Sequence, residues 1–227
     1  MCGIVGIVKF KNQTVLKADI KSMMRKMKHR GPDDNGMYID NNVGLGFVRL
    51  SILDLSPAGH QPMFSLNNRY VIVFNGEIYN YIEIRKELSH KYYFKTGTDT
   101  EVILAAYEEW GKGCLDKFNG MFAFVIYDTI SKEIFGARDR YGIKPLYYFL
   151  DSEQFIFASE IKSILPMIRA EASDRIIYDY LLFNRTDITE DTFFKRIKKL
   201  SHGSLINICE DTININKCYT LSQSVSK

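Results

Sequence analysis

Apolar residues occur in short runs along the chain, and polar clusters separate these runs. The runs at 3–10 and 43–50 predict strands. The segment 37–39 is expected to pair with the second strand, after a turn cluster at 29–36 that contains adjacent Gly and Pro residues. Before this turn, helical spacing predicts a helix over 16–28, with its apolar positions at 16, 20, 23, 24 and 27.

The middle of the chain predicts a buried strand and a well-capped helix. The run 70–74 is too uniformly apolar to face water, and it follows a turn at 67–68. Thr98 and Glu101 have the spacing of a capping box, in which Thr98 caps a helix and Glu101 reaches back to the Thr98 backbone. Gly111 is placed where it would end that helix.

The remaining segments indicate the fold class. Strands are expected over 122–127, 133–137, 146–149 and 155–158, and further helices over 79–88, 159–165 and 174–183. Many short buried strands with few helices predict two packed sheets covered by helices, which is an α+β fold. After about residue 168 the composition is more polar, so we expect 195–227 to be an extension with weak strands at best.

The composition is that of an ordinary globular protein, with 46% hydrophobic and 25% charged residues in a chain of 227. The 30 basic and 27 acidic residues give a net charge of +3, and the densest basic stretch, 195–199, is too short to predict a nucleic-acid groove. No apolar run approaches the ~20 residues of a membrane span, and Lys9 and Lys11 interrupt any signal-peptide core. We therefore expect a cytoplasmic protein that binds neither nucleic acid nor membrane.

The cysteine and histidine patterns predict neither a disulfide framework nor a metal site. The four cysteines are scattered, no Cys-x-x-Cys pair occurs, and the four histidines lack metal-ligand spacing. This cysteine content suits a reducing compartment.

Cys2 directly follows the initiator methionine. Aminopeptidases remove a first methionine when the next side chain is small, so a processed chain would begin with Cys2. That residue would carry a thiol together with a free α-amine, whose pKa of about 7.7–8.0 makes it a competent base near neutral pH. Cys2 is therefore a candidate nucleophile, and the alternative is a chance cysteine at this position.

A nucleophile of this kind needs donors for a developing oxyanion, and Asn75 with Gly76 is the best candidate pair. The buried strand is expected to end at Asn75, and Gly76 lets the backbone approach a ligand closely with its N–H exposed. The Asn75 amide and the Gly76 N–H could then point at one oxygen. The alternative is a plain Asn-Gly turn between a strand and a helix.

Three charged residues suggest a receptor for an amino acid. Arg49 ends an apolar strand, where it is either an edge residue in a salt bridge or a bidentate partner for a carboxylate. Asp99 either complements the dipole of its helix or, together with Glu77, holds a ligand ammonium. With the amide-reading pair Asn75 and Gly76, these side chains match glutamine, a zwitterion with a carboxamide.

Longer blocks of the sequence are similar to a known family. Over roughly residues 2–210 the chain resembles the glutaminase domain of the asparagine synthetase family, the N-terminal-nucleophile (class II) glutamine amidotransferases. The blocks are CGIVG at 2–6, HRGPD at 29–33, RLSILD at 49–54, QPM at 61–63, NGEIYN at 75–80, TDTE at 98–101, NGMFA at 119–123 and RDRYGIKPL at 138–146. Related amidotransferases usually carry Arg-x-Ala-Thr-His-Gly in place of RLSILD, so the asparagine synthetase branch is the better match.

The resemblance implies a four-layer αββα sandwich of the N-terminal-nucleophile hydrolase type and a role for each candidate residue. It implies that Cys2 attacks the glutamine carboxamide with its own α-amine as base, and that Asn75 and Gly76 form the oxyanion hole. It further implies that Arg49 binds the α-carboxylate and that the α-ammonium is held by two carboxylates. These carboxylates are Glu77 and Asp99, and backbone groups around Leu50, Ile52 and Leu53 line the site.

In that family, ammonia passes to a C-terminal ATP-dependent domain marked by a Ser-Gly-Gly-x-Asp-Ser loop, and this chain contains no Ser-Gly-Gly. We therefore expect a glutamine amidotransferase domain over 2–210 and, over 211–227, a linker toward a synthetase domain that is absent here. No cofactor or metal is expected in this chain, because ATP and Mg²⁺ would act in the absent domain. Glutamine and that domain are the expected partners, and a homodimer stays open.

The expected function is glutamine hydrolysis that supplies ammonia for the conversion of aspartate to asparagine. An amidotransferase acting on another carboxylate acceptor, such as a surface-polysaccharide sugar acid, is the alternative within the family. Outside that activity, the chain could be a docking domain that has lost hydrolysis or a hydrolase of some different amide. The docking domain is disfavoured by the presence of Cys2, Asn75, Gly76 and Asp99. The combination of Arg49 with Asp99 argues against the different amide.

Overall fold

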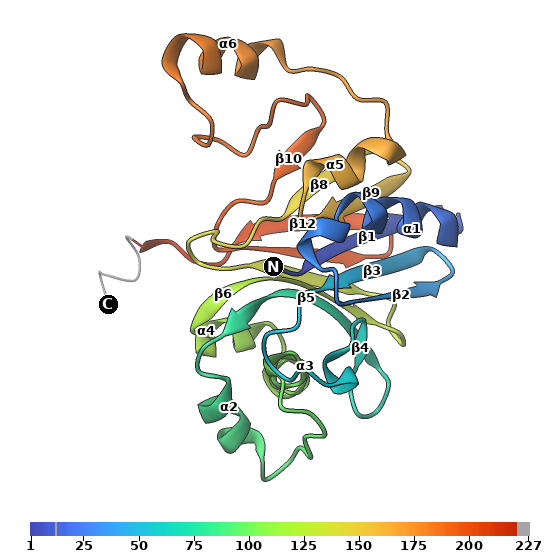
Figure 1. Ribbon diagram of the computed structural model, residues 1–227, viewed down its shortest axis with the longest axis vertical. Helices are drawn as coiled ribbons and strands as arrows, with labels where there is room; N and C mark the ends of the chain where they lie inside the picture. The colour runs from blue at the N-terminus through green and yellow to red at the C-terminus, as the bar shows by residue number, and fades with distance from the viewer. Residues whose placement is uncertain (12, 222–227) are drawn as a thin grey trace.

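The computed structural model describes residues 1–11 and 13–221 as four layers, in which two sheets are stacked between two layers of helices (Figure 1). Each sheet has six strands, and neighbouring strands are antiparallel. This arrangement confirms the α+β class and the αββα sandwich that the sequence analysis expected.

The first sheet holds the N-terminal strand in its interior, in the order β10-β8-β9-β1-β3-β2. Its strands are β1 (Gly3–Lys9), β2 (Asp34–Asp40), β3 (Val43–Arg49), β8 (Tyr147–Leu150), β9 (Gln154–Ala158) and β10 (Ile197–Lys199). Because β1 pairs with β3 on one side and β9 on the other, with Gly3 opposite Val48, the start of the chain is fixed beside the end of β3.

The second sheet has the order β12-β11-β7-β6-β5-β4. Its strands are β4 (Met63–Phe64), β5 (Tyr70–Ile78), β6 (Gly120–Asp128), β7 (Ile134–Arg138), β11 (Ser204–Cys209) and β12 (Thr212–Lys217). The long pairing of β5 with β6 runs from Tyr70 opposite Asp128 to Ile78 opposite Gly120.

Helices cover the outer face of each sheet (Figure 1). The first sheet is covered by α1 (Lys17–Lys26) and α5 (Ile161–Ile164), and the second by α2 (Tyr81–Leu88), α3 (Asp99–Trp110) and α4 (Cys114–Lys117). A further helix, α6 (Asp174–Phe183), stands away from the sandwich. Among the described residues, no helix is both long and apolar enough to cross a lipid bilayer.

The strands that lacked a clean apolar–polar alternation are buried on both faces. On β5, Val71 and Val73 belong to the core between the sheets, whereas Ile72 and Phe74 pack under the helices of the second sheet. A central strand with helices outside and a second sheet inside needs apolar residues at successive positions, which explains its uniform composition.

The capping box forms only in part. As predicted, the Thr98 hydroxyl accepts a hydrogen bond from the Glu101 N–H, at 3.3 Å. The expected return contact was wrong, because the Glu101 carboxylate instead accepts from the backbone N–H groups of Lys95 and Thr96, at 2.8 and 2.7 Å. Glu101 therefore fixes the loop before α3, and this loop closes one side of the site described below.

Two element boundaries also differ from the expectation. Strand β2 begins at Asp34, inside the predicted turn cluster, because Asp34 pairs with Arg49 at the end of β3. Helix α1 ends at Lys26, and a 3₁₀ turn over Lys28–Arg30 follows it.

The C-terminal segment contributes more structure than expected. Strand β11 pairs with β7 and buries Ile206 and Ile208 in the core between the sheets, so the expectation of weak strands at best was wrong. Strand β12 falls within the expected linker 211–227 and pairs with β11 along its length. The rest of that expected linker includes residues 222–227, which lie outside the described residues.

Candidate active site

Cys2 lies directly before β1, where the backbone of Leu50 contacts its thiol. The Leu50 N–H donates to Cys2 Sγ at 3.4 Å, and the thiol lies 3.5 Å from the Leu50 carbonyl oxygen. The Cys2 carbonyl accepts a hydrogen bond from Arg30 Nε at 2.9 Å. The pairing of β1 with β3 produces this arrangement, because it brings the first residues of the chain to the residues that follow β3.

The surroundings of Cys2 favour a thiol that stays protonated until a base removes its proton. Burial raises the pKa of the Cys2 thiol. The Leu50 hydrogen bond and the positive charges of the chain terminus, Arg49 and Lys144 oppose this effect. A cysteine in such a site needs a neighbouring base to become a nucleophile.

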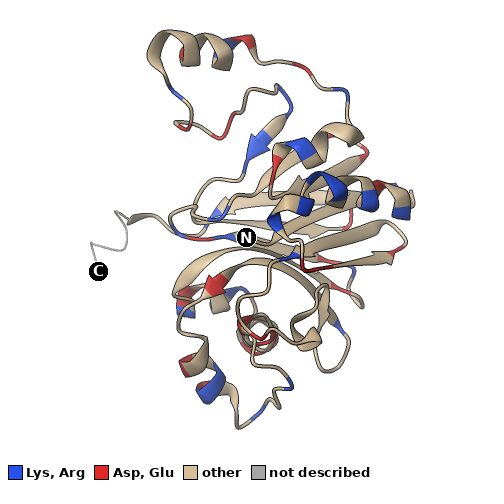
Figure 2. Ribbon diagram, viewed as in Figure 1, with Lys and Arg blue, Asp and Glu red and all other residues tan. Residues whose placement is uncertain are grey.

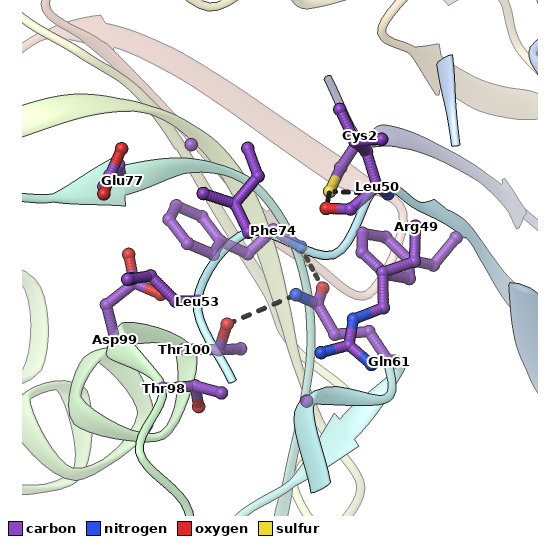
Figure 3. A pocket seen from close by; sticks show the side chains of 14 residues that line it. Cys2, Arg49, Leu50, Leu53, Gln61, Phe74, Glu77, Thr98, Asp99 and Thr100 are labelled. Atoms are coloured by element: carbon purple, nitrogen blue, oxygen red, sulfur yellow. Dashed lines mark hydrogen bonds between the residues drawn. The ribbon is translucent and has the colours of Figure 1, made fainter. Parts of the chain in front are cut away.

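Cys2 opens onto a pocket whose two sides carry opposite charges (Figure 3). Arg49 lies on one side, and Glu77 and Asp99 lie on the other. The predicted residues that line this pocket are Cys2, Arg49, Leu50, Ile52, Leu53, Gly76, Glu77 and Asp99. In the described part of the chain, no group of three or more His, Cys, Asp or Glu side chains is arranged to hold a metal ion.

Arg49 supplies the positive side of the pocket. Its guanidinium is buried and donates to two backbone carbonyls of the loop that follows, those of Ser56 at 2.9 Å and Asp54. No carboxylate forms an ion pair with Arg49 among the described residues. The salt-bridge alternative therefore finds no support, and the guanidinium retains N–H groups for a ligand carboxylate.

Asp99 supplies the negative side. It is the first residue of α3, and its Oδ2 accepts a hydrogen bond from the Ile78 N–H at 2.9 Å. Burial raises the pKa of Asp99 to about 6, and the charge of Glu77 acts in the same direction, while backbone N–H groups oppose it. At neutral pH Asp99 is thus mostly a buried anion, and it would be stabilised by a ligand cation.

Asn75 and Gly76 lie within β5, so the expectation that the strand ends at Asn75 was wrong. The strand continues because Asn75 and Gly76 remain paired with β6, opposite Ala123 and Phe122. A Cβ at Gly76 would lie 2.3 Å from the Met121 carbonyl oxygen, so this position requires glycine for close packing within the sheet. The plain-turn alternative is therefore excluded.

The side chain of Asn75 is buried, and its Nδ2 has no hydrogen-bond partner. Side chains alternate along a strand, so Asn75 points to the same face of β5 as Val71 and Val73, toward the sheet that carries Cys2. Buried amide groups are nearly always paired. Asn75 is not among the residues that line the pocket, and its Nδ2 is an unpaired buried donor on the face of β5 that looks toward the sheet of Cys2.

Gln61 and Thr100 also line the pocket, although neither was a predicted site residue. Gln61 is buried, accepts from the Phe74 N–H at 2.7 Å and donates to the Thr100 hydroxyl at 3.2 Å (Figure 3). It therefore ties β5 to α3, the two elements that present Gly76 and Asp99. Both residues belong to blocks that carry the resemblance, QPM at 61–63 and TDTE at 98–101, but neither block reveals a partner that is distant in sequence.

Comparison with known proteins identifies the family. The family model of the glutamine amidotransferase domain matches residues 1–220. This chain belongs to the glutamine amidotransferase domain family.

Curated relatives of this amidotransferase domain are longer proteins. It is 45% identical over 197 residues to a putative glutamine-hydrolysing asparagine synthetase of Methanocaldococcus jannaschii, covering 79% of this chain and 38% of that protein. It is 42% identical to asparagine synthetase 1 of Bacillus subtilis, over 93% of this chain and 34% of that protein. It is 43% identical to asparagine synthetase B of Escherichia coli, over 74% of this chain and 31% of that protein. The chain thus spans about a third of the length of these relatives.

Solved structures support the fold assignment. Glutamine phosphoribosylpyrophosphate amidotransferase from B. subtilis superposes with a TM-score of 0.72 at 17% identity, covering 96% of this chain and 50% of that one. At this level of identity the likeness concerns the fold, which is shared across the two sheets and their helices.

Proposed function

We propose that this amidotransferase domain hydrolyses glutamine to glutamate and ammonia with Cys2 as nucleophile. The observation that carries the proposal is the pocket that brings together the Cys2 thiol, a buried arginine without an ion-pair partner and a buried aspartate. A cation and an anion on opposite sides suit the α-carboxylate and α-ammonium of an amino acid. Arg49 would bind the α-carboxylate of glutamine, and Asp99 with Glu77 would bind its α-ammonium.

The reaction starts with a chain from which Met1 has been removed. The α-amine of Cys2 accepts the proton of the thiol, and the sulfur forms a bond to the carboxamide carbon of glutamine. The resulting oxyanion accepts hydrogen bonds from Asn75 Nδ2 and the Gly76 N–H, a type of contact worth about 3–4 kcal/mol per donor. The protonated α-amine of Cys2 then gives its proton to the leaving nitrogen of glutamine. The carbon–nitrogen bond breaks, and ammonia departs.

Water completes the cycle. It attacks the thioester carbon while the α-amine takes one of its protons, the carbon–sulfur bond breaks, and the sulfur regains a proton as glutamate leaves. The burial that raises the pKa of the Cys2 thiol keeps the sulfur in its neutral form between turnovers.

The ammonia would be used by a synthetase part that lies outside this chain. The named relatives are glutamine-hydrolysing asparagine synthetases, which favours aspartate as the acceptor and asparagine as the product over a sugar acid. ATP and Mg²⁺ would act in that synthetase part, and the cytoplasm is the compartment that suits this reaction.

The test measures glutamate release by protein whose loss of Met1 is verified by intact mass. A diazo ketone analogue of glutamine should label Cys2 and stop turnover, and Cys2→Ser should be neither labelled nor active. Cys114 is an internal control, because burial raises the pKa of its thiol to about 12. Labelling of Cys114, Cys209 or Cys218 instead, or turnover by protein that retains Met1, would contradict the mechanism.

A further inference from the structure

Lys144 follows a loop whose backbone is fixed by buried polar contacts. Its N–H donates to Asp139 Oδ2 at 3.0 Å, and its carbonyl accepts from Arg138 Nε at 2.6 Å. The same arginine donates to the carbonyls of Gly142 and Leu200. The loop therefore presents Lys144 from a well-defined position.

The side chain of Lys144 is buried without a carboxylate partner. Only 6% of the residue is exposed, and no ion pair to it occurs in the described part of the chain. Its Nζ instead contacts Met1 Sδ at 3.4 Å. A thioether is a weak acceptor, and a buried ammonium so poorly paired costs free energy. This cost points to a role other than stabilising the fold.

The contact with Met1 places this ammonium beside the reacting residue. Five covalent bonds join Met1 Sδ to the Cys2 nitrogen, so the 3.4 Å contact puts the ammonium in the same region as the nitrogen that becomes the α-amine after processing. Lys144 and Cys2 also interact electrostatically, since the charge of Lys144 lowers the pKa of the Cys2 thiol. Burial and Arg30 lower the pKa of Lys144 itself, while the charges of Cys2, Glu77 and Asp139 oppose that shift.

We infer that Lys144 is a positioning residue of the glutaminase site, whose ammonium keeps the α-amine of processed Cys2 in the neutral form that accepts a proton. The inference rests on the proposed role of Cys2. A positive charge in a poorly solvated site disfavours a second one nearby, so the pKa of the α-amine falls. An ordinary α-amine, with a pKa of about 7.7–8.0, is mostly protonated at pH 7, and a base works best when its pKa is near the operating pH.

Other charged groups face the same region from several elements. Arg30 donates to the Cys2 carbonyl from the 3₁₀ turn and is paired with Glu160 at 3.0 Å. Further charged groups are Arg49 at the end of β3, Glu77 on β5 and Asp139 after β7. A substitution of Lys144 leaves all of them in place, so a shift in the α-amine reports on Lys144. Figure 2 shows where the charged residues lie over the whole sandwich.

The test titrates the α-amine directly. Protein with Cys2 freed by a protease that cleaves before it is carbamylated with cyanate across a pH series, and the modified N-terminal peptide is quantified by mass spectrometry. Lys144→Gln should raise the pKa of the α-amine by about one unit and move the acid limb of kcat/KM by the same amount. Lys144→Arg should restore both values, and Lys112→Gln, which changes an exposed lysine, should alter neither.

An α-amine that titrates alike in wild type and Lys144→Gln would overturn the inference, whatever happens to turnover. Failure of Lys144→Arg to restore the titration would overturn it too. If the glutamine variant does not fold, Lys144→Met, which keeps the apolar stem, provides the same comparison. Absence of glutamate release in the wild type would instead refute the proposed function, and the titration separates these two outcomes because it needs no turnover.

Discussion

Arg49 and Gly59 fit together so closely that a side chain at Gly59 would displace the guanidinium: a Cβ there would lie 2.1 Å from Arg49 Nη2 and 2.8 Å from its Cζ. Real carbon–nitrogen contacts are not that short, so a methyl group at this position must displace the guanidinium. The position of the proposed carboxylate-binding group is therefore set by a residue that carries no functional atoms.

This contact predicts the effect of Gly59→Ala. Displacing the guanidinium should raise the KM for glutamine at least about tenfold, because a misplaced bidentate partner loses a charge-assisted hydrogen bond worth ~1.5–3 kcal/mol. Steady-state glutaminase kinetics measure the effect. The matched control is Gly113→Ala, where a Cβ would meet nothing within 4 Å. Equal KM values for the two variants would remove Arg49 from carboxylate binding.

Asn75→Ala should lower kcat by about 10²–10³-fold with little change in KM, because the amide acts on the oxyanion and not on the bound substrate. The Nδ2 atom of Asn75 has no partner to lose, so the circular dichroism spectrum should stay that of the wild type. If KM rises while kcat is unchanged, Asn75 instead binds glutamine in the ground state.

Asp99→Asn should stabilise the unliganded protein at pH 7–8. The pKa of Asp99 is about 6 when folded, against an ordinary value of 3.8 for an aspartate. Protonated Asp99 therefore stabilises the folded state fully at pH values below 3.8, the pKa in the unfolded chain. This contribution to the free energy of unfolding is lost as pH rises through about 6. Removing the charge should therefore raise the free energy of unfolding by up to ~3 kcal/mol at pH 8 and by almost nothing near pH 4, as measured by urea unfolding. Equal stabilisation at both pH values would argue against a buried carboxylate here.

The same substitution should weaken glutamine binding. In the wild type, KM should rise as pH falls below about 6, because protonation of Asp99 removes the partner of the α-ammonium. In Asp99→Asn, KM should be high at neutral pH and nearly flat across this interval. A wild-type KM that does not change between pH 5 and 7 would assign ammonium binding to another residue, with Glu77 as the first candidate.

Asp139→Ala should cost about 3–5 kcal/mol of unfolding free energy. Its carboxylate accepts hydrogen bonds from the backbone N–H groups of Phe122, Tyr141, Ile143 and Lys144, at 3.0 to 3.2 Å. Loss of this acceptor leaves buried donors unpaired. Chemical denaturation measures the loss, and Asp116→Ala, at an exposed aspartate, is the control with an expected change below about 0.5 kcal/mol. Similar stability of both variants would show that water replaces the carboxylate.

Local patterns predicted the parts of the fold that depend on neighbours in sequence. The apolar run at β1, the helical spacing of α1 and the Thr98 cap all correspond to the structure. The pocket also collects Arg49, Glu77 and Asp99, as the resemblance implied. These features could be predicted because each depends on a few adjacent side chains or on a motif that preserves its own spacing.

Features set by distant pairing could not be predicted. Strand β11 looks weak in sequence, because it is short and Asn207 interrupts its apolar residues, and it becomes a strand through its pairing with β7. The continuation of β5 through Asn75 and Gly76 depends on β6 in the same way, although an Asn-Gly pair favours a turn locally. The roles of Gln61 and Lys144 depend on burial, which no spacing within their own segments reveals.

The late pairing of β11 with β7 has a consequence for biosynthesis. Strand β7 is translated long before β11, so the nascent sheet carries a bare edge of backbone donors and acceptors until the last strands emerge. Such an edge is a template for strands of other molecules. Translation that halts between the two strands would thus yield a product prone to assemble edge to edge.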